Sequence, residues 1–159
     1  MTNEIIIREY EPGDPSQVAY LHMKFYAEQY GFKGIFEYYV LKTIVEFLEN
    51  PSGGQLWVAV QDNTVKGSIA VVRHSETSAQ LRWLVVDKAV QGRGVGNKLW
   101  ETALRFCDEQ GYVNLHLLTA NMLDTARHIY KKHGFTLAEA KENTTWADYS
   151  FLVEKWERC

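Results

Sequence analysis

The chain has 159 residues, of which 46% are hydrophobic and 13% aromatic, enough to bury a core in one globular domain. Its formal net charge of -3 argues against bulk binding to nucleic acids, and no apolar run approaches the roughly 20 residues that span a bilayer. Residues 1–4 lack the basic and apolar regions of a signal peptide, and Cys107 and Cys159 have no metal-ligand spacing. We therefore expect a cytoplasmic protein without a metal, whose partners include neither nucleic acid nor membrane.

The N-terminal part of the chain predicts a strand followed by two helices. The β-branched isoleucines within residues 4–10 favour the strand. The first helix is expected to begin at Asp14, acting as the N-cap with Gln17 completing a capping box, and to end at Gly31. Residues 35–49 carry an apolar stripe at helical spacing and predict the second helix.

The remaining chain alternates strands and helices. Strands are predicted at residues 55–61, 65–73, 79–87, 113–118, 135–141 and 148–156, and helices at residues 95–110 and 122–133. Polar residues 62–64 favour a hairpin between the first two of these strands. This order indicates a mixed α/β sheet, and without repeats or linkers it indicates one domain over residues 1–159.

A glycine-rich turn lies between a strand and a helix. Gly92, Gly94 and Gly96 leave space for main-chain N–H groups to converge where the helix begins near Val95, which favours a phosphate ligand. The spacing excludes the dinucleotide fingerprint, because Asn97 stands where its third glycine is needed, and the chain has no P-loop.

Two motifs resemble the GNAT superfamily of N-acetyltransferases. Residues 91–96 match the pattern Q/R-x-x-G-x-G/A, which in that superfamily holds the pyrophosphate of acetyl-CoA. Residues 126–135 match A-x-x-x-Y-x-x-x-G-F, with Ala126 and Tyr130 on one helix face. The resemblance covers roughly residues 79–137, and the element order of the whole chain agrees with it.

The resemblance implies the GNAT fold, a central mixed sheet of about seven strands with helices on both faces, and acetyl-CoA as co-substrate. The strand end at residues 84–86 would part from strand 113–118, so that unpaired main-chain groups bind the pantetheine amides. The turn would hold the pyrophosphate. The cofactor-binding residues expected in this way are Leu84, Val85, Val86, Gln91, Gly92, Arg93, Gly94, Val95 and Gly96.

The resemblance places Tyr130 beside the thioester sulfur. A phenol with a pKa of about 10 is protonated at neutral pH and can protonate the leaving thiolate, so Tyr130 is the expected general acid. The N–H of Val86 is expected to polarise the thioester carbonyl. Two positions depart from the family pattern: Gln80 replaces a glutamate that is catalytic in some members, and Leu123 replaces a cofactor-binding asparagine. Asn121 lies nearby and is the alternative cofactor contact.

In GNAT folds the first two helices cover the acceptor site, and here they are rich in aromatic residues. We expect a pocket for a small amine, with His22, Tyr26 and Glu37 as substrate-binding residues. Glu37 is also the candidate catalytic base, and His22 is the other residue expected to steer or deprotonate the amine. Glu37 equally fits a solvated carboxylate at a helix start.

A narrower resemblance links residues 22–37 and 81–86 to the acetyltransferase half of MarR–GNAT fusion proteins, without any sign of the MarR domain. The expected function is transfer of an acetyl group from acetyl-CoA to the primary amine of a small-molecule or amino-acid-like acceptor, by direct attack on the thioester. Two alternatives stay open: acetylation of a protein lysine or N-terminus, and a catalytically silent acyl-CoA-binding sensor. GNAT proteins are often dimers, so a homodimer is one expected assembly.

Overall fold

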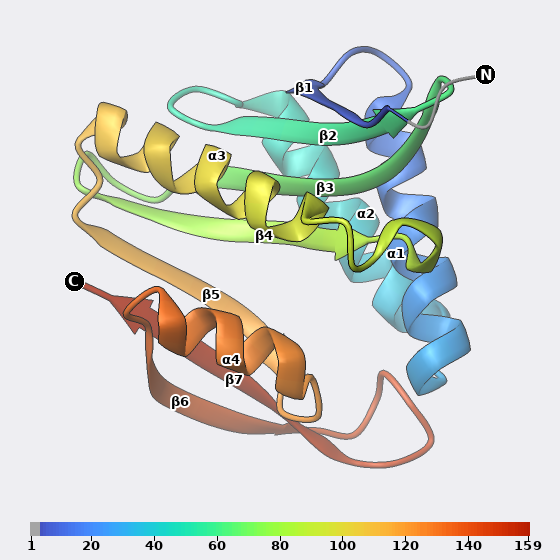
Figure 1. Cartoon of the computed structure of the whole chain (residues 1–159). Coiled ribbons are helices and arrows are strands. Elements are labelled where there is room, and N and C mark those ends of the chain that lie inside the picture. The colour runs from blue at the N-terminus through green and yellow to red at the C-terminus, as the bar shows by residue number, and fades with distance from the viewer. Residues whose placement is uncertain (1–3) are drawn as a thin grey trace.

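The computed structural model describes residues 4–159 (Figure 1). Residues 1–3, part of the segment without a signal-peptide pattern, lie outside the described residues. In chain order the elements are β1 (Ile6–Glu9), α1 (Asp14–Tyr30), α2 (Gly34–Glu49), β2 (Gln55–Gln61), β3 (Thr64–Arg73), β4 (Ser78–Val86), α3 (Val95–Gln110), β5 (Asn114–Ala120), α4 (Asp124–Lys132), β6 (Thr136–Asn143) and β7 (Phe151–Arg158). Every predicted helix and strand is present, and a short 3-10 helix (Lys88–Val90) adds to them.

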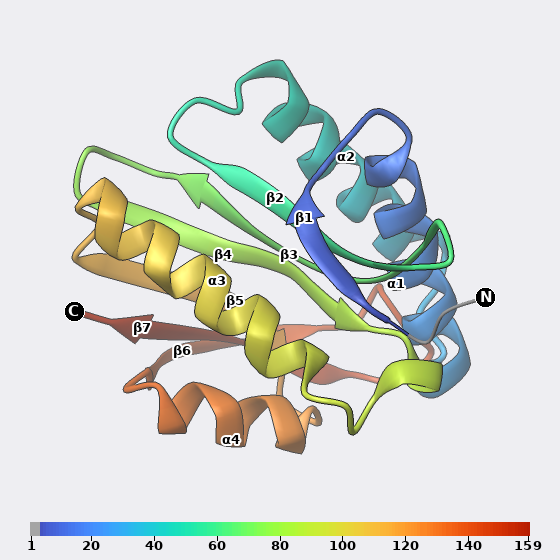
Figure 2. The same ribbon diagram turned by 45° about the horizontal axis from the view of Figure 1, so that its top comes forward.

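One seven-stranded sheet organises the molecule, with the strand order β1-β2-β3-β4-β5-β7-β6. Neighbouring strands are antiparallel except β4 and β5, which are parallel. Helices α1 and α2 cover one face, and α3 and α4 cover the other (Figures 1 and 2). The structure thus confirms the predicted mixed α/β class, with helices on both faces of the sheet.

The two faces bury two separate cores because successive strand residues point to opposite sides. In β2, Trp57 belongs to the core under α3 and α4, whereas Leu56 and Val58 belong to the core under α1 and α2. The predicted β2–β3 hairpin turns through Asp62 and Asn63, both with the positive φ (49° and 61°) that a tight two-residue turn requires.

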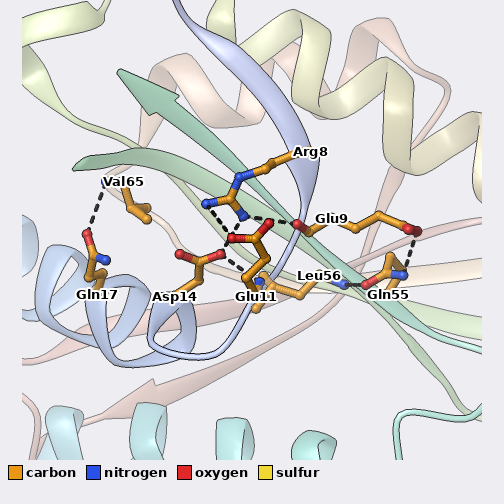
Figure 3. Close-up of polar contacts among 8 residues, drawn as sticks. All are labelled: Arg8, Glu9, Glu11, Asp14, Gln17, Gln55, Leu56 and Val65. Atoms are coloured by element: carbon orange, nitrogen blue, oxygen red, sulfur yellow. Dashed lines mark hydrogen bonds and ion pairs between the residues drawn. The ribbon is translucent and has the colours of Figure 1, made fainter. Parts of the chain in front are cut away.

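The predicted capping box at the start of α1 is wrong (Figure 3). Asp14 is the first helical residue, and its carboxylate accepts hydrogen bonds from the Arg8 guanidinium (2.6 Å) and the Glu11 N–H (2.7 Å). Gln17 instead accepts a hydrogen bond from the Val65 N–H of β3 (3.1 Å). An almost fully buried carboxylate requires a cation, and Arg8 of the adjacent strand supplies it.

Within residues 4–159, no helix has both the length and the apolar composition needed to cross a bilayer. In the same part of the chain, no group of three or more His, Cys, Asp or Glu side chains is placed to hold a metal ion.

Candidate active site

The centre of the sheet is open because β4 and β5 pair over only part of their length. The pairing joins residues 78–80 of β4 to residues 114–116 of β5. Beyond these pairs, residues 81–86 and 117–120 are not paired with each other, and the strands diverge toward the arrowhead of β4 in Figure 1. We call this separation the β4–β5 opening. It is present where the sequence predicted that the two strands part.

A β-bulge directs the end of β4 into this opening. Trp83 has a left-handed backbone (φ 52°), and the register with β3 shifts beside it, between Ser68 and Ala70. The Ser68 hydroxyl donates a hydrogen bond to the Trp83 carbonyl (2.6 Å), which satisfies the buried carbonyl of the bulge. A non-glycine residue in this conformation costs on the order of 1 kcal/mol, which the surrounding contacts offset.

The pairing with β3 decides which main-chain groups face the opening. The Asp87 N–H donates to the Lys66 carbonyl (2.7 Å), which marks these two residues as a hydrogen-bonded pair. Because main-chain groups alternate along a strand, Val85 bonds to β3, and Leu84 and Val86 present theirs to the opposite side. Of the three strand-end residues predicted to bind the cofactor, Leu84 and Val86 therefore face the opening and Val85 does not.

The segment after β4 is fastened to the strand by two side chains. Asp87 accepts a hydrogen bond from the Ala89 N–H (2.9 Å) and caps the 3-10 helix. The Gln91 side-chain amide donates to the Val86 carbonyl (3.1 Å). Gln91 thus holds the turn against the end of β4. Because its side chain occupies the Val86 carbonyl, the Val86 N–H is the main-chain group of this residue that remains available at the opening.

The glycine turn ends at the uncapped start of α3. Gly92 and Gly94 have left-handed backbones (φ 79° and 77°), and a Cβ at either position would meet nothing within 4 Å. No side chain caps α3, and its first turn contains no acidic residue. Its first N–H groups and the positive end of its dipole are therefore available to an anion. Arg93 and Lys98 add positive charge, so this donor set fits a diphosphate.

A cavity of about 310 Å³ lies where the opening meets α1, α2 and α4. Its walls are mainly aromatic. The aromatic residues that line it are Tyr26, Phe32, Phe36, Tyr39, Trp83, Trp100, Tyr130 and Trp146. The polar residues that line it are His22, Thr43, Gln80, Arg82 and Thr119. The size and composition are those of a small-molecule site.

Tyr130 reaches the cavity from α4 and is only 6% exposed. Its ring packs between Trp100 and Trp156, with centroid distances of 5.6 and 6.0 Å. Burial raises the pKa of the Tyr130 hydroxyl above its ordinary value. The hydroxyl is therefore protonated at neutral pH, as a proton donor must be.

His22 reaches the cavity from α1, and its imidazole is neutral. Its Nδ1 lies 2.8 Å from the Val18 carbonyl, and because a carbonyl only accepts, Nδ1 carries the proton. Burial lowers the pKa of His22 to about 4. Neutral His22 therefore presents an unprotonated Nε2 as a hydrogen-bond acceptor.

The low pKa of His22 has a measurable effect on stability. As pH falls below about 6.5, the unfolded chain binds a proton at His22 that the folded chain does not bind until about pH 4, so the free energy of unfolding falls. We expect wild type to lose about 2 kcal/mol more than His22→Gln between pH 7 and pH 5. Urea unfolding of both proteins at each pH measures this. Equal losses would show that His22 does not resist protonation.

Glu37, predicted for the acceptor site, and Asn121, the alternative cofactor contact, do not line the cavity. Glu37 follows the inward-facing Phe36 by one helical position, so its side chain is exposed and does not line the cavity. Asn121 accepts a hydrogen bond from the Leu152 N–H and donates its own N–H to the Leu152 carbonyl, both at 2.9 Å. Its side-chain oxygen thus joins β5 to β7. The structure brings together His22, Tyr26 and Tyr130, but neither Glu37 nor Asn121.

Sequence reasoning missed Arg82 and Trp146, which also line the cavity. Arg82 follows Gln80 by two residues, and strand periodicity was the signal that places both on one face. Trp146 lies in the β6–β7 loop, where its N–H donates to the Asn143 side chain (3.1 Å) and its carbonyl accepts from the Lys33 N–H (2.7 Å). No local pattern predicts that this loop docks beside α2.

Comparison with solved structures shows the same fold. A GNAT-family acetyltransferase from Staphylococcus aureus Mu50 superposes with a TM-score of 0.79 over 98% of both chains, at 19% identity. An aminoglycoside 6′-N-acetyltransferase complexed with coenzyme A superposes with a TM-score of 0.69 over 96% of both chains, at 18% identity.

Sequence comparison identifies the family. N-acetylaspartate synthetase from Homo sapiens is 30% identical over 93 residues, which are 58% of this chain and 31% of that protein. The chain thus spans about a third of the length of this curated relative. The family model described as the acetyltransferase (GNAT) domain matches residues 24–149. The chain therefore belongs to the GNAT acetyltransferase family.

Proposed function

We propose that the protein is an acetyl-CoA-dependent N-acetyltransferase that acetylates the primary amine of a small molecule. One arrangement along β4 carries the proposal: the uncapped glycine turn follows the unpaired edge of this strand, and a cavity lined by a buried, protonated tyrosine lies beside that edge. The likeness to a structure complexed with coenzyme A supports the cofactor assignment. Acetyl-CoA supplies the acetyl thioester.

The main-chain groups of this chain would hold and polarise the co-substrate. The N–H groups of residues 92–96 fit the diphosphate, and Leu84 and Val86 offer main-chain groups to pantetheine, as an added strand would use them. The Val86 N–H fits the role of oxyanion donor to the thioester carbonyl.

The reaction in this proposal forms a C–N bond and breaks the C–S bond. The neutral amine attacks the thioester carbonyl carbon, the sulfur leaves as a thiolate, and the Tyr130 hydroxyl donates its proton to that sulfur. The attacking nitrogen releases a proton to solvent, and solvent returns one proton to the Tyr130 phenolate, so no net proton is gained or lost. His22 Nε2 accepts a hydrogen bond from the amine and orients it, because a pKa of about 4 makes His22 a weak base. Glu37 takes no part, since its side chain is exposed outside the cavity.

The cavity favours a small acceptor over a protein segment. Aromatic rings of α1, α2 and the β6–β7 loop wall it in, with Tyr26 5.3 Å from Phe32 and Phe36 5.1 Å from Trp146 between centroids. One relative is named for an acetylated amino acid, N-acetylaspartate, which agrees with a small acceptor. We propose further that residues 1–159 act as one catalytic domain, similar to the acetyltransferase half of MarR–GNAT fusion proteins.

Thiol release from acetyl-CoA tests the proposed function. We expect release above the hydrolysis background with at least one class of small primary amine, and none with N-acetylated forms of the same amines. Release with lysine-containing peptides alone would identify a protein acetyltransferase. Binding of coenzyme A without turnover of any amine would identify a silent sensor and contradict the proposal.

A further inference from the structure

Arg82 brings a positive charge to the wall of the cavity. It lies on β4 with Gln80, two residues apart and therefore on the same face of the sheet. The Arg82 Nε donates a hydrogen bond to Gln80 Oε1 at 2.7 Å. Gln80 is buried, so it fixes the guanidinium while leaving the two terminal NH₂ groups for another partner.

The charge of Arg82 is not matched by a carboxylate in contact. Among residues 4–159, no ion pair includes Arg82. The exposed Glu46 of α2 acts on it only through the longer-range charge interaction, and burial lowers the pKa of Arg82. A partly desolvated guanidinium without an anion is a costly arrangement, and an entering anion would relieve it.

The other half-buried arginines have partners of their own. Arg8 pairs with Asp14 at 2.6 Å, and Arg127 pairs with Glu154 at 3.1 Å. Arg158 lies over the Phe135 ring and donates to the His133 carbonyl. Arg82 is thus distinguished in the described part of the chain by facing the cavity with its NH₂ groups uncommitted.

We propose that Arg82 binds a carboxylate of the acceptor, so that the substrate class is amino acids and similar small amines that carry a carboxylate. The inference rests on the proposed function and names the substrate class of that site. A guanidinium matches the planar, two-oxygen geometry of a carboxylate. Arg82 would hold this end of the acceptor while its amine meets His22 and the region of Tyr130.

Matched acceptors test the proposal. Each α-amino acid of a panel is compared with its α-amide and its decarboxylated amine, by thiol release from acetyl-CoA and by calorimetric binding in the presence of coenzyme A. We expect kcat/KM and affinity to favour the carboxylate form in wild type. Arg82→Gln should lower kcat/KM for the acid by about 100-fold, through KM, while the neutral amines change little.

Two variants guard against a purely structural effect. Gln80→Glu places a carboxylate where Gln80 Oε1 already contacts Arg82, so it should neutralise the guanidinium internally and lower the ratio of acid to neutral-amine rates. If the new carboxylate also acted as a base, it would raise the rates with the acid and with the neutral amine alike, and the ratio of the two rates would not change. Arg105→Gln, which removes the same charge from an exposed position of α3, is the control and should leave the ratio unchanged.

The outcomes separate this inference from the proposed function. Turnover of neutral amines as fast as of acids, or a ratio unaffected by Arg82→Gln, overturns the inference and leaves the acetyltransferase activity standing. Arg82-dependent binding of amino acids without turnover supports the inference and refutes the activity. The absence of any Arg82-dependent binding or preference overturns the inference in either case.

Discussion

Replacing Tyr130 by phenylalanine is expected to lower kcat for acetyl transfer by about 100- to 1,000-fold, within the range that a general acid contributes. The variant removes the proton donor and keeps the ring between Trp100 and Trp156, so folding and affinity for coenzyme A should change little. Because burial raises the pKa of Tyr130, the wild-type enzyme should lose no activity through ionisation of this hydroxyl below about pH 10.

The measurement is kcat as a function of pH for wild type, Tyr130→Phe and a control. Tyr38→Phe is a suitable control, because this tyrosine of α2 is 53% exposed and does not line the cavity. An unchanged kcat in Tyr130→Phe at every pH would exclude Tyr130 as the proton donor, even if the fold and the cofactor site are as proposed.

A negative charge in the glycine turn is expected to weaken coenzyme A binding by about 100-fold, from the repulsion between two charges a few ångströms apart near a protein surface. Gly94 is the position to use, since its φ of 77° is one that Asn and Asp tolerate and a Cβ there has free space. Gly94→Asp and Gly94→Asn have the same shape and differ by one charge. Their comparison isolates electrostatics from backbone strain.

The same pair of variants should show the opposite order in stability. An aspartate at the start of α3 interacts favourably with the helix dipole, so unliganded Gly94→Asp should be about 0.5 kcal/mol more stable than Gly94→Asn. Calorimetry with coenzyme A at low and high salt, together with urea unfolding, measures both effects. Equal affinities in the two variants would mean that no phosphate group lies at this turn.

The sequence predicted the fold well because its signals are local. Residues 55–61 and 95–110 were predicted with the ends that β2 and α3 have in the structure, since the periodicity lies within each segment and glycines stand directly beside it. The capping box failed for a non-local reason: Arg8, on the preceding strand, competes for the Asp14 carboxylate.

The candidate site was predictable where a motif or the aromatic first helix indicates it: His22 and Tyr26 were predicted from that helix, and both line the cavity. The glycine turn and Tyr130 stand in motifs; the turn precedes the uncapped start of α3, and Tyr130 lines the cavity.

To predict Arg82, one would have to know which face of β4 meets α2. To predict Trp146, one would have to know that the β6–β7 loop, distant in the sequence, packs at the cavity. Glu37 was wrongly predicted to lie in the acceptor site, because a shift of one helical position separates the cavity-lining Phe36 from the exposed Glu37.

The short pairing between β4 and β5 also bears on the mechanics of the molecule. Within residues 4–159, the strand pairing between the two pieces of the sheet is limited to residues 78–80 and 114–116. Two main-chain hydrogen bonds to the Thr77 carbonyl extend it at one end, and Trp100 packs against Tyr130 of α4. With so few paired residues, the junction of β4 and β5 should act as a hinge that resists twisting weakly. A ligand bound along the unpaired edges of both β4 and β5 would hold the two pieces of the sheet together. Ligand binding in the opening should therefore slow amide hydrogen exchange in both pieces.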